Sequence, residues 1–142
     1  RQWEASGRPC ASSPVPIALD EELIGLNDAK QKADMLDAVH PKYIILKPTL
    51  HGGLRGSEEW IRLAGERGIG FWATSALESN VGLNAIAQWR AASDCTMPQG
   101  LGTGQLFTDN MESYPLSIRG EALHFDPDAP EPDLRSWLGL ER

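Results

Sequence analysis

The chain has 142 residues, of which 41% are hydrophobic and 23% charged, and its formal net charge is −7. This composition is typical of a globular protein, and an acidic balance without Lys/Arg clusters argues against nucleic-acid binding. The longest apolar runs span only a few residues, whereas a transmembrane helix needs about 20. We therefore expect neither a nucleic-acid partner nor a membrane partner.

The cysteines and the first residue lead to two further expectations. Cys10 and Cys95 are isolated in the sequence, which favours unpaired thiols in a reducing compartment, the cytoplasm, over a disulfide framework. The chain starts at Arg1 rather than Met, which predicts a fragment of a longer chain.

The first predicted strand and helix occupy residues 15–39. The apolar run at residues 15–19 ends at Asp20 and predicts a buried strand with acidic residues at its carboxyl end. A helix is expected over residues 29–39, because apolar residues recur there at helical spacing, and Asn27 is expected to be its N-cap.

Two similar strand–helix pairs follow in the sequence. Residues 43–46 form a predicted second strand that ends at Lys47, and Ser57 is expected to open the next helix. Residues 69–74 form a predicted third strand, and Asn80 is expected to cap a third helix.

The remaining sequence has a different character. Residues 99–104 are expected to form a very short strand and a Gly-rich loop. Residues 116–125 alternate loosely around Gly120 and suggest antiparallel strands. Residues 126–142 are expected to form an acidic, Pro-rich tail with a short helical turn near residues 134–140.

Strands that alternate with helices predict a parallel α/β sheet, and such sheets build their sites at the carboxyl ends of the strands. The residues with reactive or binding chemistry follow the predicted strands: Asp20, Lys47, Ser75 and Glu78, then Gly102 and Thr103. We therefore expect a site at this edge of the sheet.

Three segments, in this order, resemble one family of enzymes. They are residues 18–21, residues 46–50 with Gly52-Gly53, and residues 74–79 with Gly82-Leu83. They resemble strands five, six and seven of the o-succinylbenzoate synthases, which belong to the muconate-lactonizing-enzyme-like subgroup of the enolase superfamily. Residues 100–103 fall where the eighth strand of that family lies. The resemblance covers about residues 1–125 and implies the C-terminal half of a TIM-type (β/α) barrel.

The resemblance also implies an activity and a role for individual residues. The family dehydrates a cyclohexadiene carboxylate to o-succinylbenzoate, a step toward menaquinone. Asp20 matches a carboxylate ligand of Mg²⁺, which Mn²⁺ can replace, and Lys47 matches a catalytic lysine that faces the substrate. The expected substrate-binding residues are Thr49, Gly52, Ser75, Glu78, Ser79, Gly102 and Thr103.

These residue types suit the implied chemistry. Removal of a proton beside a carboxylate creates an enediolate, whose negative charge a divalent cation and an ammonium group can stabilise. The family's second-strand lysine pair and first two metal carboxylates lie upstream of the matched region. We therefore expect no useful turnover from this chain alone, and we expect either the N-terminal half of the same enzyme or a second copy as its partner.

Several alternatives remain open. Glu78 is equally suited to stabilise a helix N-terminus, and Ser75 and Ser79 lack the neighbours of a catalytic serine. His51, beside the site loop, is expected to pack or to form a hydrogen bond. Muconate cycloisomerases, N-acylamino acid racemases and dipeptide epimerases share the same strand-end plan. A non-catalytic α/β fragment is the alternative from another functional class.

Overall fold

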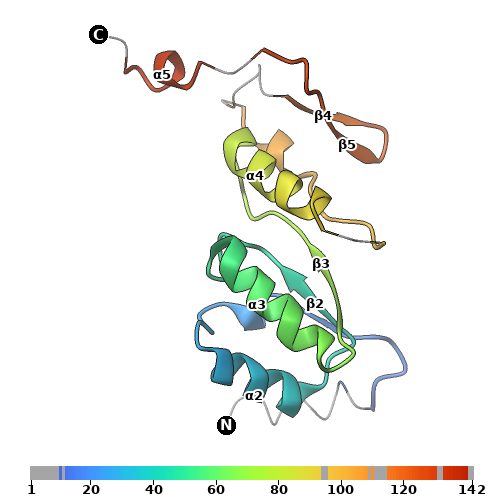
Figure 1. Ribbon diagram of the computed structural model, residues 1–142. Helices are drawn as coiled ribbons and strands as arrows, with labels where there is room; N and C mark the ends of the chain where they lie inside the picture. Colours follow the sequence, from blue (N-terminus) through green and yellow to red (C-terminus); the bar gives the residue numbers. More distant parts are fainter. Residues whose placement is uncertain are drawn as a thin grey trace. The chain divides into compact units, whose positions relative to one another are not determined.

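The structure is a computed structural model that describes residues 10, 12–93, 96–108, 110, 115–130 and 133–140 (Figure 1). The chain divides into two compact units. The first unit comprises residues 1–76 and 95–100, and the second comprises residues 77–94 and 101–142. The predicted boundary between a barrel half and a tail at residue 125 stays a prediction.

A parallel sheet forms the centre of the first unit. Its strands are β1 (Ala18–Leu19), β2 (Tyr43–Leu46) and β3 (Gly70–Ala73), and they lie in the order β1-β2-β3. An isolated parallel bridge joins Thr74 to Gly100 beyond β3. The predicted order of parallel strands is therefore confirmed, although β1 is shorter than the apolar run that predicted it.

The first helix, α2 (Ala29–Val39), has the predicted bounds but a different cap. The side chain of Asp28 accepts hydrogen bonds from the backbone N–H groups of Lys30 and Gln31. The prediction of Asn27 as the N-cap is therefore wrong by one residue. An Asp at this position also places negative charge at the positive end of the helix dipole.

The second helix, α3 (Gly53–Gly65), begins before the residue that was expected to open it. Gly52 has a φ of 87°, so the chain turns into the helix at a left-handed position that favours glycine. Ser57 lies buried inside the helix and donates a hydrogen bond from its Oγ to the Gly53 carbonyl at 3.0 Å. The predicted start at Ser57 is wrong. Glycine has a low helix propensity, so the sequence pattern did not extend the helix upstream to Gly53.

The hydrophobic core of the first unit lies between the sheet and these two helices. Alternate residues of β2, Ile44 and Leu46, face α2 and α3 and are buried. The remaining buried residues of this cluster are Leu19, Leu23, Met35, Leu36, Val39, Trp60, Leu63, Ala64 and Ile69. The helices thus cover one face of the sheet, as a β/α arrangement requires.

The other face of the sheet is only partly buried. Tyr43 and Trp72 share this face, and their ring centroids lie 5.8 Å apart. The Tyr43 ring packs against Gly70 of the neighbouring strand β3. A side chain at Gly70 would prevent this contact, because its Cβ would lie 2.6 Å from the ring. In a closed barrel this face would line the interior.

The second unit contains α4 (Asn80–Ala91), the 3₁₀-helix η2 (Thr103–Leu106), and an antiparallel hairpin of β4 (Leu116–Arg119) and β5 (Ala122–Phe125). A short helix, α5 (Leu134–Trp137), follows. The hairpin and the helical turn are as predicted.

The cap of α4 differs from the prediction. Ser79 is the N-cap and Asn80 is the first helical residue, because Ser79 still has extended backbone angles. The backbone N–H of Asn80 donates instead to the side chain of Asn110.

Replacement of Gly56 by Ala should lower the free energy of unfolding by about 1–3 kcal/mol. The reason is that a Cβ at Gly56 would overlap the carbonyl oxygen of His51 and force α3 away from the loop. Gly65→Ala is the matched control, since a Cβ there meets nothing within 4 Å, and it should be stabilising by up to about 1 kcal/mol. Urea unfolding measures both changes, and equal stability of the two variants would contradict this packing.

Candidate active site at the strand ends

Asp20 and Lys47 meet at the carboxyl ends of β1 and β2. The two strands pair in parallel, with Ala18 opposite Tyr43 and Leu19 opposite Ile44, so the residues that follow them lie at the same edge of the sheet. Lys47 Nζ lies 2.7 Å from Asp20 Oδ1 and 2.7 Å from Glu21 Oε1. The predicted catalytic and metal-binding residues are therefore in direct contact.

Two hydrogen bonds fix the backbone of Asp20 at the carboxyl end of β1. Its backbone N–H donates to Glu22 Oε2 at 3.0 Å, and its carbonyl accepts from the Leu23 N–H at 3.1 Å. Oδ1 is buried, and among the described residues it accepts no well-aligned hydrogen bond. The contact with Lys47 is thus an ion pair at hydrogen-bonding distance, and it leaves acceptor capacity on Asp20.

The charge state of Lys47 follows from its surroundings. Burial lowers the pKa of Lys47, but the close contacts with the negatively charged carboxylates of Asp20 and Glu21 outweigh burial, so the net pKa is raised above its usual value. The hydrogen bond from Lys47, with its positive charge, holds the pKa of the exposed Glu21 carboxyl below its usual range. Lys47 is therefore an ammonium ion at neutral pH, suited to electrostatic stabilisation or to proton donation.

His51 lies in the loop that follows Lys47 and contacts the Lys47 backbone. Its side chain is buried, and its Nδ1 accepts a hydrogen bond from the backbone N–H of Lys47 at 3.0 Å. Burial lowers the pKa of His51 to about 4, although the nearby Asp20 carboxylate partly opposes this effect. The ring is therefore neutral at physiological pH, and the expected hydrogen bond is confirmed.

Three of the predicted substrate-binding residues belong to the first unit. Thr49 and Gly52 lie in the loop between β2 and α3, on the carboxyl side of β2. Ser75 follows β3, is buried, and donates its backbone N–H to the Gly100 carbonyl at 3.3 Å. These residues follow the ends of two of the paired strands, and their substrate contacts stay a prediction.

The other four predicted residues belong to the second unit. Glu78 and Ser79 directly precede α4, and Gly102 and Thr103 begin η2. A Cβ at Gly82 would lie 2.8 Å from Glu78 Oε2, so the carboxylate lies over the first turn of α4. That position suits the helix-stabilising role that was considered for Glu78. The site roles of all four residues stay predictions.

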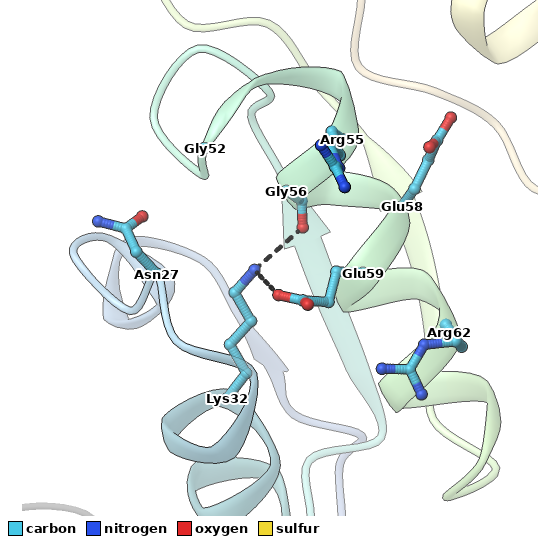
Figure 2. A pocket seen from close by; sticks show the side chains of 8 residues that line it. All are labelled: Asn27, Lys32, Gly52, Arg55, Gly56, Glu58, Glu59 and Arg62. Atoms are coloured by element: carbon cyan, nitrogen blue, oxygen red, sulfur yellow. Dashed lines mark hydrogen bonds and ion pairs between the residues drawn. The ribbon is translucent and has the colours of Figure 1, made fainter.

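A separate groove of about 500 Å³ lies between α2 and α3 (Figure 2). The residues that line it are Asn27, Lys32, Gly52, Arg55, Gly56, Glu58, Glu59 and Arg62. Lys32 points from α2 to the first turns of α3, where its Nζ donates to the Gly56 carbonyl at 3.2 Å and to Glu59 Oε2 at 2.7 Å. The ammonium also lies 5.4 Å from the centroid of the Trp60 ring.

Sequence reasoning missed Lys32, although a signal was present. Lys32 lies on the same helical face as Met35, Leu36 and Val39, all of which are buried. A lysine on an apolar face predicts a nearby partner of opposite charge. Here that partner, Glu59, lies on the neighbouring helix, so the groove contains an ion pair that fastens α2 to α3.

Asp20 is the described residue that was predicted to bind a metal ion. Asp20 offers one carboxylate with a buried oxygen, which fits a single ligand of a Mg²⁺ ion. No group of three or more His, Cys, Asp or Glu residues within this part of the chain could hold a metal ion. None of the helices in the described part of the chain has the length and hydropathy of a membrane span.

Parallel strands that alternate with helices, with an ion pair at the carboxyl ends of two adjacent strands, define a parallel α/β fold, of which β/α barrels are one class. No family model matches the chain. Over 122 residues, 86% of its length, the chain is 64% identical to o-succinylbenzoate synthase of Desulfotalea psychrophila, and it spans about 33% of that relative.

Solved structures agree with this relationship. The crystal structure of MenC from Desulfotalea psychrophila matches 87% of the chain with a TM-score of 0.81 and 60% identity, and the chain covers 34% of that protein. Muconate lactonizing enzyme from Pseudomonas putida matches 84% of the chain and 33% of its own length, with a TM-score of 0.72 and 23% identity. The chain is thus similar to about one third of o-succinylbenzoate synthase, and the predicted α/β fold with parallel strands, shared with part of the MenC structure, is confirmed.

The Lys32–Glu59 pair predicts an asymmetry between two variants. The side chain of Lys32 is 2% exposed and that of Glu59 is 33% exposed, so Glu59→Gln leaves a buried ammonium without its counter-charge, whereas Lys32→Met leaves a carboxylate that water can reach. We expect losses of about 3 and about 1 kcal/mol, respectively, in the free energy of unfolding. Glu58→Gln, at the exposed rim of the groove, is the control. A larger loss for Lys32→Met would rule out this account.

The buried, neutral His51 predicts a pH dependence of stability. Its pKa of about 4 in the folded protein lies below the unfolded value of about 6.5, so its contribution is complete above pH 6.5 and is lost as the pH falls toward 4. Denaturant unfolding between pH 4 and 8 should show that His51→Asn removes this part of the slope. A difference between wild type and variant that does not change with pH would refute the prediction.

Proposed function

We propose that this chain is the C-terminal part of a longer cytoplasmic lyase, a Mg²⁺-dependent o-succinylbenzoate synthase. The enzyme would dehydrate 2-succinyl-6-hydroxy-2,4-cyclohexadiene-1-carboxylate to o-succinylbenzoate in menaquinone biosynthesis. The observation that carries the proposal is 64% identity to o-succinylbenzoate synthase over 122 residues. The contact of 2.7 Å between Lys47 and Asp20 supports it, because the reaction needs both a cation and an anionic ligand for the metal at one site.

Lys47 would act through its charge. Removal of the ring proton beside the substrate carboxylate places negative charge on the carboxylate oxygens, and an ammonium next to them lowers the barrier. Because its pKa is raised by Asp20 and Glu21 despite burial, Lys47 is better suited to stabilise charge or donate a proton than to remove one. The base would then be a lysine from the part of the enzyme upstream of this chain.

Asp20 would contribute one ligand to the metal site. Its buried Oδ1 and its position after β1 suit a hard divalent cation, Mg²⁺ or Mn²⁺, which binds carboxylate oxygens. The remaining ligands would come from the upstream part of the barrel. When bound, the ion supplies positive charge for the enediolate that the reaction generates.

The substrate-binding residues are proposed on the ground of the family resemblance. Thr49, Gly52 and Ser75 follow the ends of β2 and β3, where barrel enzymes bind substrate. For Glu78, Ser79, Gly102 and Thr103, which belong to the second unit, the proposed substrate contacts rest on the family resemblance alone.

A second candidate function keeps the fold and changes the reaction. The L-Ala-D/L-Glu epimerase from Bacillus subtilis matches 87% of the chain with a TM-score of 0.74, but only 17% of the residues are identical. At that identity the likeness supports the fold alone, so an epimerase, racemase or cycloisomerase ranks below the synthase. The non-catalytic fragment ranks lower still, because the chain is 64% identical to an enzyme over 122 residues.

Turnover by the proposed full-length protein tests the function. Asp20→Asn and Lys47→Met should each lower kcat/KM for formation of o-succinylbenzoate by about 100-fold or more, since each removes a charge at the reacting centre. The ion pair between Lys30 and Asp34 on the exposed face of α2 offers matched controls. Asp34→Asn and Lys30→Met should stay within about twofold of wild type. A wild-type protein that makes no o-succinylbenzoate with Mg²⁺ present would refute the assignment.

A further inference from the structure

We infer that His51 is a positioning residue for Lys47: its ring accepts the Lys47 backbone N–H and thereby fixes the direction in which the ammonium extends toward Asp20. The inference rests on the proposed function of that site. It gives His51 a role in the reaction that the family resemblance does not imply.

The hydrogen bonds around Lys47 converge on His51. The Lys47 N–H donates to His51 Nδ1 at 3.0 Å, and the Lys47 carbonyl accepts the His51 N–H at 3.1 Å. The same carbonyl also accepts the Leu50 N–H at 2.8 Å. One residue therefore holds both polar groups of the Lys47 backbone, at the point where the chain leaves β2.

The packing behind His51 prevents this loop from relaxing. His51 is 1% exposed, and α3 approaches so closely that Gly56 has no room for a Cβ against the His51 carbonyl. The Gly56 carbonyl is held in turn by the buried ammonium of Lys32 (Figure 2). The contacts thus run from α2 through α3 to the loop that carries Lys47.

The hydrogen bonding of the ring explains why a histidine suits this position. Because Nδ1 accepts a hydrogen bond, the ring proton lies on Nε2, and Nε2 is buried without a partner among the described residues. A buried unpaired N–H is destabilising by about 1–3 kcal/mol. An apolar side chain would fill the same space without that penalty, so packing alone does not favour His51, whereas the acceptor at Nδ1 does.

Two variants separate the acceptor from the packing. In His51→Asn the amide oxygen stands the same number of bonds from Cα as Nδ1 and can accept the Lys47 N–H. His51→Leu has the same branching and no acceptor. Both variants leave the space of the outer part of the ring unfilled, so loss of packing affects them alike.

The test measures kcat and KM for o-succinylbenzoate formation by the proposed full-length protein, together with crystal structures of both variants. His51→Leu should lower kcat by at least about 10-fold with KM within about threefold of wild type, because the ammonium is displaced from the reacting centre. His51→Asn should keep kcat within about threefold. Equal losses in the two variants, or wild-type kcat in His51→Leu, would overturn the inference.

The crystal structures separate this inference from the proposed function. Lys47 Nζ should remain paired with Asp20 in His51→Asn and leave it in His51→Leu. If the wild-type protein makes no o-succinylbenzoate, the proposed function fails, and the structures alone then decide whether His51 positions Lys47. An intact ion pair in His51→Leu would overturn the inference whatever the activity.

Discussion

The parallel pairing of β2 with β1 and β3 is the constraint on which the rest of the structure depends. Parallel strands bring their carboxyl ends to the same edge of the sheet, so Asp20 and Lys47 become neighbours although they are far apart in the sequence. The in-register pairing of β1 with β2 leaves Asp20 and its neighbour Glu21 beside the ammonium. The candidate site is thus a consequence of strand direction and register.

The helices secure this arrangement from outside the sheet. The ion pair between Lys32 and Glu59 fastens α2 to α3, and the close approach of Gly56 to His51 fixes α3 against the loop after β2. Buried apolar residues supply most of the stabilisation of such a layer, but they are not directional. The polar contacts between the helices and the loop are directional, so they fix the positions of the charged side chains in the site.

Much of the fold could be predicted from the sequence because local signals agree there. The bounds of α2 and β2 follow from an apolar pattern that is interrupted by Pro41. The predicted N-caps of α2 and α4 were wrong by one residue, because neighbouring residues such as Asn27 and Asp28 have similar capping ability. The pairing of Lys32 with Glu59 and the contact between His51 and Lys47 depend on packing between elements, which local patterns do not encode. The strand pattern itself singled out Asp20 and Lys47 at the strand ends, and the family resemblance supplied their expected roles.

The central claim is that Asp20 and Lys47 belong to one site that binds a metal ion and a carboxylate substrate. A crystal structure of the proposed full-length protein with Mg²⁺ and o-succinylbenzoate tests it most directly. The account predicts the ion on the Asp20 carboxylate and the Lys47 ammonium within reach of the bound acid. An ion bound away from Asp20, or the acid bound in the groove between α2 and α3, would contradict it.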